Sequence, residues 1–137
     1  MTTPVSIPES VTLAFHAMAL IALDGSGGRL SLSQLRIGNA SLDHLSKVLQ
    51  KLVRAGFLES KRGAKGGFQL AKPAEDITLL DIWVALEGNV SAESCSLLTD
   101  GCPLPRCVFG SLVEDGNRQF REYFAHTTLA SFAAEGG

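Results

Sequence analysis

Three cysteines lie within thirteen residues in the second half of the 137-residue chain. Cys95, Cys102 and Cys107 have the spacing C-x6-C-x4-C, and a glycine and two prolines between them disfavour a regular helix or strand. Thiolates are soft ligands that suit iron-sulfur clusters or zinc, and an irregular loop can wrap such a site without breaking a helix. Because three is one short of four, a fourth ligand would come from elsewhere in the chain, a partner subunit, solvent or a small molecule. The odd number is also a poor disulfide framework and favours a reducing compartment.

The first element that could support such a site is a helix predicted from about Glu9 to Leu23, opened by a capping box at residues 6–9. It is apolar on nearly every side, so we expect it to be buried all round by its own domain and in part by a second subunit. Its exceptions are Glu9, Thr12 and His16, which share one stripe at i, i+3 and i+7. A polar line on a buried helix needs partners, and for a lone histidine these are most often backbone groups or water.

Residues 31–56 have the order of a helix-turn-helix. A capping box at residues 31–34 predicts a short helix to about Ile37, a turn follows at residues 38–39, and a second helix begins after Ser41 and stops at Gly56. The apolar stripe of the second helix comprises Leu42, Leu45, Val48, Leu49, Leu52 and Val53. Such a helix lies in the major groove with its N-terminal residues nearest the bases. The residues predicted to make groove contacts are Ser41, Asp43, His44 and Lys47, with Lys51 as a further DNA contact.

A basic hairpin is predicted directly after this helix. Two short strands, at residues 57–60 and 68–71, are joined by a glycine-rich basic turn at residues 61–67. A helix followed by such a hairpin is typical of a winged helix-turn-helix. We expect Arg62 and Lys65 to contact DNA, and Gly66 and its neighbouring glycines to let the backbone lie close to it, in the minor groove.

Charge is distributed unevenly along the chain. Residues 41–72 hold seven basic and two acidic side chains, a net charge of +5, whereas the remainder holds five basic and twelve acidic ones, a net charge of −7. The overall charge of −2 therefore conceals a basic unit in an acidic body, as expected when one surface meets phosphate. The alternative is a solvated helix face beside an ordinary surface hairpin.

Two further helices complete the expected architecture. Thr78 and Asp81 form a capping box for a helix from Leu79 to Glu87, which would support the hairpin. The side chains predicted to face inward from it are Leu80, Trp83, Val84 and Leu86. Beyond Pro105 a longer amphipathic helix has too little of its own domain to cover its apolar stripe, which indicates a subunit interface. That stripe comprises Val108, Phe109, Leu112, Val113, Phe120, Tyr123 and Phe124.

The hairpin region also carries a recognisable sequence motif. The pattern AG(F/L)-x-S-x-RG-x-x-GG(F/Y)-x-LA, followed by IT-L-x-DI, is matched here by Ala55-Gly56-Phe57, Ser60, Arg62-Gly63, Gly66-Gly67-Phe68, Leu70-Ala71, Ile77-Thr78-Leu79 and Asp81-Ile82. In this the chain resembles the Rrf2 family of bacterial transcription regulators, without gaps from about Ser41 to Gly88. The resemblance implies a mainly α fold with a small β-hairpin. It divides the chain into a winged helix-turn-helix at residues 1–88, a cysteine loop at 89–107, and a dimerisation helix with a C-terminal tail at 108–137.

The resemblance also implies a cofactor and partners. Many Rrf2 regulators hold a [2Fe-2S] or [4Fe-4S] cluster with three cysteines in this region, sense nitric oxide, redox state or iron-sulfur supply, and bind palindromic promoter DNA as homodimers. Some have a histidine three residues after the last cysteine, where this chain has Gly110. Others take the fourth ligand from the first helix of the partner subunit, and for that role we expect His16 first and Glu9 second. The expected ligands are thus Cys95, Cys102, Cys107 and His16.

Other functions are weighed against this one. A thiol-based or zinc-based regulator would use the same cysteines without a cluster, and an iron-sulfur carrier would have no need of the +5 segment. No constellation of catalytic residues indicates an enzyme. No run approaches the roughly 20 apolar residues that a membrane span requires, so a cytoplasmic protein is expected.

Overall fold

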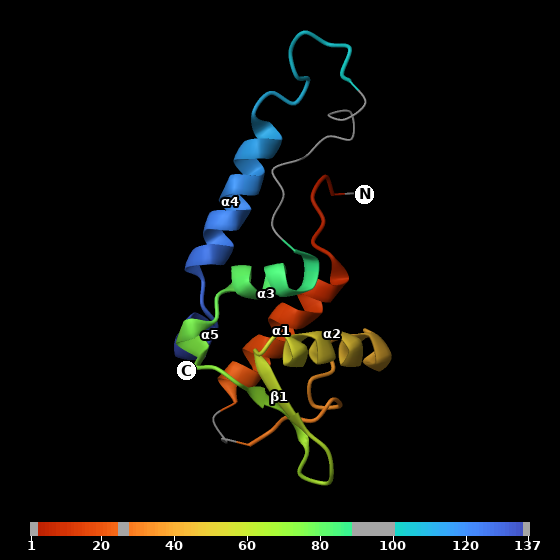
Figure 1. Ribbon diagram of the computed structural model, residues 1–137, viewed down its shortest axis with the longest axis vertical. Helices are drawn as coiled ribbons and strands as arrows, with labels where there is room; N and C mark the ends of the chain where they lie inside the picture. The colour runs from red at the N-terminus through yellow and green to blue at the C-terminus, as the bar shows by residue number, and fades with distance from the viewer. Residues whose placement is uncertain (1–2, 25–27, 89–100, 136–137) are drawn as a thin grey trace.

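The computed structural model describes residues 3–24, 28–88 and 101–135 (Figure 1). The elements in chain order are α1 (Glu9–Leu23), α2 (Leu42–Arg54), β1 (Leu58–Lys61), β2 (Gly67–Leu70), the 3₁₀ turn η1 (Ala74–Asp76), α3 (Leu79–Glu87), α4 (Leu112–His126) and α5 (Leu129–Glu135). The expected mainly α fold with one β-hairpin is therefore confirmed. Figure 1 places the hairpin at one end of the molecule, while α4 runs from α5 towards the other end. No helix in the described part of the chain combines the length and the apolar character needed to span a membrane.

Helix α1 is the centre of the core. It packs against α2, α3, α5 and β2, and Val11, Ala14 and Met18 are completely buried. The prediction of burial all round is wrong for the single chain, because His16, Leu20 and Leu23 are exposed. The predicted capping box at residues 6–9 is also wrong. Pro8 is the N-cap and makes no side-chain bond, and its carbonyl oxygen instead accepts from the amides of residues 11 and 12.

Helix α2 has the caps that its sequence predicts. The Ser41 hydroxyl oxygen accepts a hydrogen bond from the His44 amide at 3.3 Å. At the other end the Phe57 amide donates to the Leu52 carbonyl oxygen and the Gly56 amide donates to the Val53 carbonyl oxygen, both at 3.0 Å. This pair of bonds is a Schellman motif, and Gly56 supplies the positive φ of 90° that it requires. The buried side chains Leu45, Val48, Leu49 and Leu52 come from the predicted stripe.

The segment before α2 is shorter than predicted. The capping pair at residues 31–34 forms, with the Ser31 amide donating to Gln34 Oε1 at 2.8 Å and the Gln34 amide donating to Ser31 Oγ at 3.2 Å. The hydrogen bonds continue only as far as residue 36, so one turn stands where a helix to Ile37 was expected. Leu35 is fully buried and holds this turn against the core.

The hairpin is antiparallel and begins one residue later in β1, and one earlier in β2, than the sequence predicted. Leu58 pairs with Leu70 and Lys61 pairs with Gly67. An additional bridge joins Leu30 to Phe68, with backbone hydrogen bonds of 3.0 and 2.8 Å in the two directions. This third pairing was not predicted, because a single bridging residue has no periodicity.

Helix α3 begins with the predicted capping box. The Thr78 hydroxyl oxygen accepts from the Asp81 amide, and the Asp81 carboxylate accepts from the Thr78 amide, both at 3.0 Å. The set of inward-facing residues was partly wrong. Leu79 and Ile82 are the buried residues of this helix, whereas Val84 is 40% exposed. The Trp83 ring stacks on Phe124 of α4 with a centroid distance of 5.4 Å, so tryptophan has the core role that was expected.

Helices α4 and α5 close the fold. The helix expected just after Pro105 begins only at Leu112, and residues 108–111 form turns. Phe124 is the buried residue of α4. The chain then returns to the core, because the Leu79 amide donates to the Thr127 carbonyl oxygen at 2.9 Å and the Leu129 amide donates to the Ile77 carbonyl oxygen at 3.0 Å. Consequently α5 packs against α1, and α4 is left projecting from both (Figure 1).

Candidate functional site

The outer face of α2 is polar and open to solvent. Ser41, Asp43, Lys47 and Lys51 are all exposed, while His44 is half-buried. Lys47 Nζ lies 3.1 Å from Asp43 Oδ2, an i, i+4 ion pair on that face. His44 contacts a residue of another element, since its Nδ1 lies 3.3 Å from Glu9 Oε1 at the start of α1. All five residues predicted from the second helix are thus brought together on one face or at its edge.

The hairpin turn, residues 62–66, presents two exposed cations, Arg62 and Lys65. Its backbone is tightly folded, because the Gly66 amide donates to the Gly63 carbonyl oxygen at 2.9 Å. A Cβ atom on Gly66 would lie 2.2 Å from the Lys61 carbonyl oxygen, so this position accommodates only glycine. Gly66 itself is half-buried. Its role in the fold is to compact the turn that displays the two cations.

The two cysteines in the described part of the chain, Cys102 and Cys107, lie apart from this basic surface. Cys102 and Cys107 are exposed with free thiols, and Cys95 lies outside the described residues. Residues 101–110 are at the far end of α4 from the hairpin (Figure 1). Among the described residues, no three or more His, Cys, Asp or Glu side chains are grouped closely enough to hold a metal ion. Because Cys95 lies outside the described residues and His16 is expected from the partner subunit, the expected ligand set stays a prediction.

His16 is exposed on α1, and its ring is held by its own helix. Its Nδ1 lies 2.6 Å from the Thr12 carbonyl oxygen, so Nδ1–H donates, and in the neutral ring Nε2 carries the lone pair. A metal-binding histidine commonly has this arrangement. The same contact occurs at His126, whose Nδ1 lies 2.7 Å from the Glu122 carbonyl oxygen. The hydrogen bond is therefore compatible with a ligand role for His16 but does not by itself distinguish His16 from His126.

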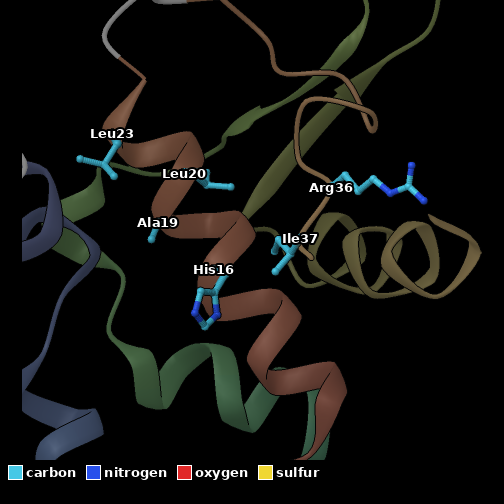
Figure 2. Close-up of a pocket in the computed structure, with 6 residues that line it drawn as sticks. All are labelled: His16, Ala19, Leu20, Leu23, Arg36 and Ile37. Carbon is cyan, nitrogen blue, oxygen red and sulfur yellow. The ribbon is translucent and has the colours of Figure 1, made fainter. Parts of the chain in front are cut away.

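His16 also borders a pocket that the sequence did not reveal (Figure 2). The pocket has a volume of about 360 Å³ and is lined by His16, Ala19, Leu20, Leu23, Arg36 and Ile37. The guanidinium of Arg36 points away from His16 in Figure 2, so the lining is almost entirely apolar. Ala19, Leu20 and Leu23 follow His16 at i+3, i+4 and i+7, a spacing that can be seen in the sequence, but the turn at residues 36–37 completes the pocket only in the fold.

Comparison with known proteins decides the family. The model of the Rrf2 family, described as "Iron-dependent Transcriptional regulator", matches residues 7–135. The chain belongs to the Rrf2 family. An HTH-type transcriptional regulator of Neisseria meningitidis serogroup A is 34% identical over 122 residues, which cover 86% of this chain and 80% of that protein. This Rrf2 protein is therefore a transcriptional regulator with a DNA-binding fold, and the resemblance noted in its sequence is confirmed.

Solved structures agree with the family assignment. CymR, the global cysteine regulator of B. subtilis, superposes with a TM-score of 0.76 at 28% identity, covering 96% of this chain and 98% of that one. IscR of T. potens superposes with a TM-score of 0.75 at 24% identity, covering 98% of this chain and 90% of that one. At that identity the IscR comparison bears on the fold alone. The family description names a transcriptional regulator, and CymR is likewise described as a regulator.

Proposed function

We propose that this Rrf2 regulator binds double-stranded DNA with α2 in the major groove and the hairpin turn close to the DNA backbone in the minor groove. The observation that carries the proposal is the exposure of Lys47 and Lys51 on α2 and of Arg62 and Lys65 on the turn, in a chain whose net charge is −2. A basic surface on an acidic body is the electrostatic signature of phosphate binding. The proposed DNA contacts are Ser41, Asp43, His44, Lys47, Lys51, Arg62, Lys65 and Gly66.

The start of α2 suits this role for a separate reason. Ser41 caps one amide of the first turn, and the other amides at a helix N-terminus attract phosphate. Asp43 and His44 follow directly and can accept from or donate to base edges, Asp43 being suited to the amino group of cytosine. Asp43 also holds Lys47 at 3.1 Å, which keeps the lysine on the same face.

The test of DNA binding is the salt dependence of affinity for DNA upstream of the protein's own gene. Lys47→Ala, Arg62→Ala and Lys65→Ala should each weaken binding and lower the slope of log affinity against log salt by about one, because each removes one phosphate contact. Arg121→Ala is the control, since Arg121 is an exposed cation on α4. Slopes that stay unchanged in all three variants would remove this surface from the DNA contact.

We further propose that the regulator is a homodimer through α4 and matches a palindromic operator. Leu112 is 70% exposed and Tyr123 is 58% exposed on this helix. Large apolar side chains left in solvent along a projecting helix favour an interface with a second copy. A two-fold dimer presents two α2 helices to two half-sites.

For the cysteines we propose an iron-sulfur cluster held by Cys95, Cys102 and Cys107, with His16 of the partner subunit as the fourth ligand. The donor set fits this group chemically, since the thiols of Cys102 and Cys107 are free and exposed and the Nε2 of His16 is not used by its own helix. When bound, a cluster would supply reversible redox and ligand-exchange chemistry. The family description as iron-dependent supports this choice.

The first experiment is a visible spectrum with iron and sulfide analysis on protein purified without oxygen. Bands at about 320 to 420 nm with stoichiometric sulfide are expected. Cys102→Ala should abolish them and leave a folded protein, because Cys102 is exposed and outside the core. If Cys102→Ala unfolds the protein, a structural zinc is favoured instead.

The role of His16 is tested against a matched histidine. His16→Ala should alter the visible spectrum and destabilise the cluster, whereas His126→Ala should not, although both rings bond to the carbonyl oxygen four residues earlier. Equal spectra for His16→Ala and the wild type would exclude His16 as the fourth ligand.

A second candidate is a thiol-based regulator without a cluster. It is favoured by the free, exposed thiols of Cys102 and Cys107 and by the likeness to CymR, which is described as a cysteine regulator. A colourless, iron-free protein whose DNA affinity changes on thiol oxidation would support it. A third candidate is an iron-sulfur carrier with no DNA role. It predicts that Lys47→Ala, Arg62→Ala and Lys65→Ala leave the measured DNA affinity unchanged.

A further inference from the structure

The first turn of α1 bonds to two other elements through neighbouring residues. Glu9 Oε1 lies 3.3 Å from Nδ1 of His44, the third residue of α2. Ser10 Oγ donates to Glu87 Oε1 at 2.9 Å, and Glu87 is the last residue of α3. One helical turn is thus tied both to the start of the predicted recognition helix and to the end of α3.

The contact with Glu9 fixes the imidazole ring of His44, which the cap of α2 does not constrain. The backbone amide of His44 already donates to Ser41 Oγ, so α2 is capped whatever its ring does. With Nδ1–H donating to Glu9, the imidazole plane is set and Nε2 remains available to a partner outside the protein. The ring is 39% exposed and Glu9 is 64% exposed, so both are accessible from the surface that carries the proposed groove contacts.

The contact with Ser10 joins α1 to the end of α3, after which the three cysteines follow in the chain. Glu87 is followed by Gly88, which has a positive φ of 83° and ends α3. The chain beyond Gly88 carries all three cysteines. A shift of the C-terminal end of α3 would therefore pull on Ser10, and Ser10 is adjacent to Glu9.

We infer that this turn of α1 positions two other parts of the protein. Glu9 orients His44 for DNA reading, and Ser10 links the turn to the end of α3, after which the cysteine loop (residues 89–107) follows in the chain. The Glu9 step rests on the proposed DNA-binding function, and the Ser10 step rests also on the proposed iron-sulfur sensing. Glu9 and Ser10 act through other residues and need not touch DNA themselves. A change in the cysteine loop would thus be transmitted to α2 through the Ser10–Glu87 bond, one turn of α1 and the Glu9–His44 contact.

The Glu9 step is tested by a double-mutant cycle with His44. The readout is the ratio of affinities for a footprinted site upstream of the protein's own gene and for the same DNA with one half-site base pair substituted, because a ratio is insensitive to the lost charge. Glu9→Ala should reduce this ratio by about two- to fivefold, in line with the loss of one exposed side-chain contact. Glu9→Gln should restore most of it, since an amide oxygen also accepts from Nδ1–H. In a His44→Ala background, Glu9→Ala should have no further effect.

The control is Glu114→Ala, which also removes an exposed acidic side chain from the first turn of a helix, here α4. An unchanged ratio in Glu9→Ala, or the same loss with and without His44, would overturn the Glu9 step. Wild-type protein that binds both DNAs equally would instead overturn the proposed function. A change in the visible spectrum of Glu9→Ala with an unchanged DNA ratio would assign Glu9 to the cluster and overturn its role in positioning His44.

The Ser10 step is tested by comparing iron-loaded and iron-free protein. Ser10→Ala should bring the ratio of their operator affinities closer to one and speed amide hydrogen exchange in residues 42–45 of the iron-free protein. Ser111→Ala is a matched control, because Ser111 Oγ also donates to a carboxylate at 2.9 Å, that of Asp115 on α4. A wild-type ratio different from one that Ser10→Ala leaves unchanged would overturn the link alone. A wild-type ratio of one would overturn both the link and the proposed sensing.

Discussion

Gly67 lies where β2 meets the chain at Leu30. Its φ is 137°, and a Cβ atom there would lie 2.4 Å from the Leu30 carbonyl oxygen. The next residue, Phe68, makes both backbone bonds to Leu30 and is buried. Gly67 therefore permits the close approach that ties the hairpin to the body of the protein, and with it the placement of Arg62 and Lys65.

At this scale we predict that Gly67→Ala is markedly more destabilising than Gly63→Ala. Both glycines have positive φ, so both variants carry backbone strain of about 1 to 3 kcal/mol. Only Gly67 also has a backbone atom in the way, whereas nothing lies within 4 Å of a Cβ on Gly63. Thermal unfolding measures the difference. Equal losses of stability would show that the Leu30 bridge contributes nothing to holding the hairpin.

At the level of secondary structure, N-caps are the main local features that determine where a helix begins. α2 and α3 both begin at a hydroxyl residue that accepts an amide hydrogen bond, and α3 has the full reciprocal pair. α1 begins at Pro8 without a side-chain cap, although Ser6 stands at the same kind of position in the sequence. A capping motif therefore predicts the start of a helix only where the residues directly after it are helical.

We predict that Thr78→Ala lowers the free energy of unfolding by about 1 kcal/mol, the usual cost of losing an N-cap. Ser6→Ala is the control and should have almost no effect, since Ser6 is exposed and does not cap α1. Denaturant unfolding of the two variants provides the comparison. A loss at Ser6 as large as that at Thr78 would contradict this account of the caps.

The whole molecule consists of a packed winged-helix body and a projecting helix. α5 returns to α1 and closes the core around Leu129, which is fully buried. α4 in between is anchored by Phe124, whose ring meets Phe15 and Trp83 at centroid distances of 5.5 and 5.4 Å. The other large apolar side chains of this helix, Leu112, Phe120 and Tyr123, are exposed in the single chain, and this exposure is the basis of the proposed dimer.

We predict that Leu112→Glu yields a folded monomer. The side chain is exposed, so its replacement should leave the fold intact while placing a charge in the proposed interface. Arg121→Glu is the control, because residue 121 lies on the opposite side of α4 from residue 112 at 100° per residue. Sedimentation measures the mass and circular dichroism measures the fold. A dimeric Leu112→Glu protein would move the interface away from this face of α4.

The sequence by itself determined the local features. Residue types fixed the caps of α2 and α3, the Schellman end at Gly56, and a basic hairpin directly after an amphipathic helix, because each depends on neighbours within a few positions. The wording of residues 41–88 also indicated the family that comparison then established. The candidate DNA residues followed from the same local order, and their contacts remain a prediction.

Only the tertiary structure decided what depends on residues far apart in the chain. The pairing of Leu30 with Phe68, the contact of Glu9 with His44, and the pocket between α1 and residues 36–37 join segments that no periodicity relates. The buried face of α3 was predicted only in part for the same reason, since an almost wholly apolar helix does not reveal which side its neighbours cover. Packing of α3 against α1, α2 and α4 made that choice, because the side that excludes water depends on what lies opposite it.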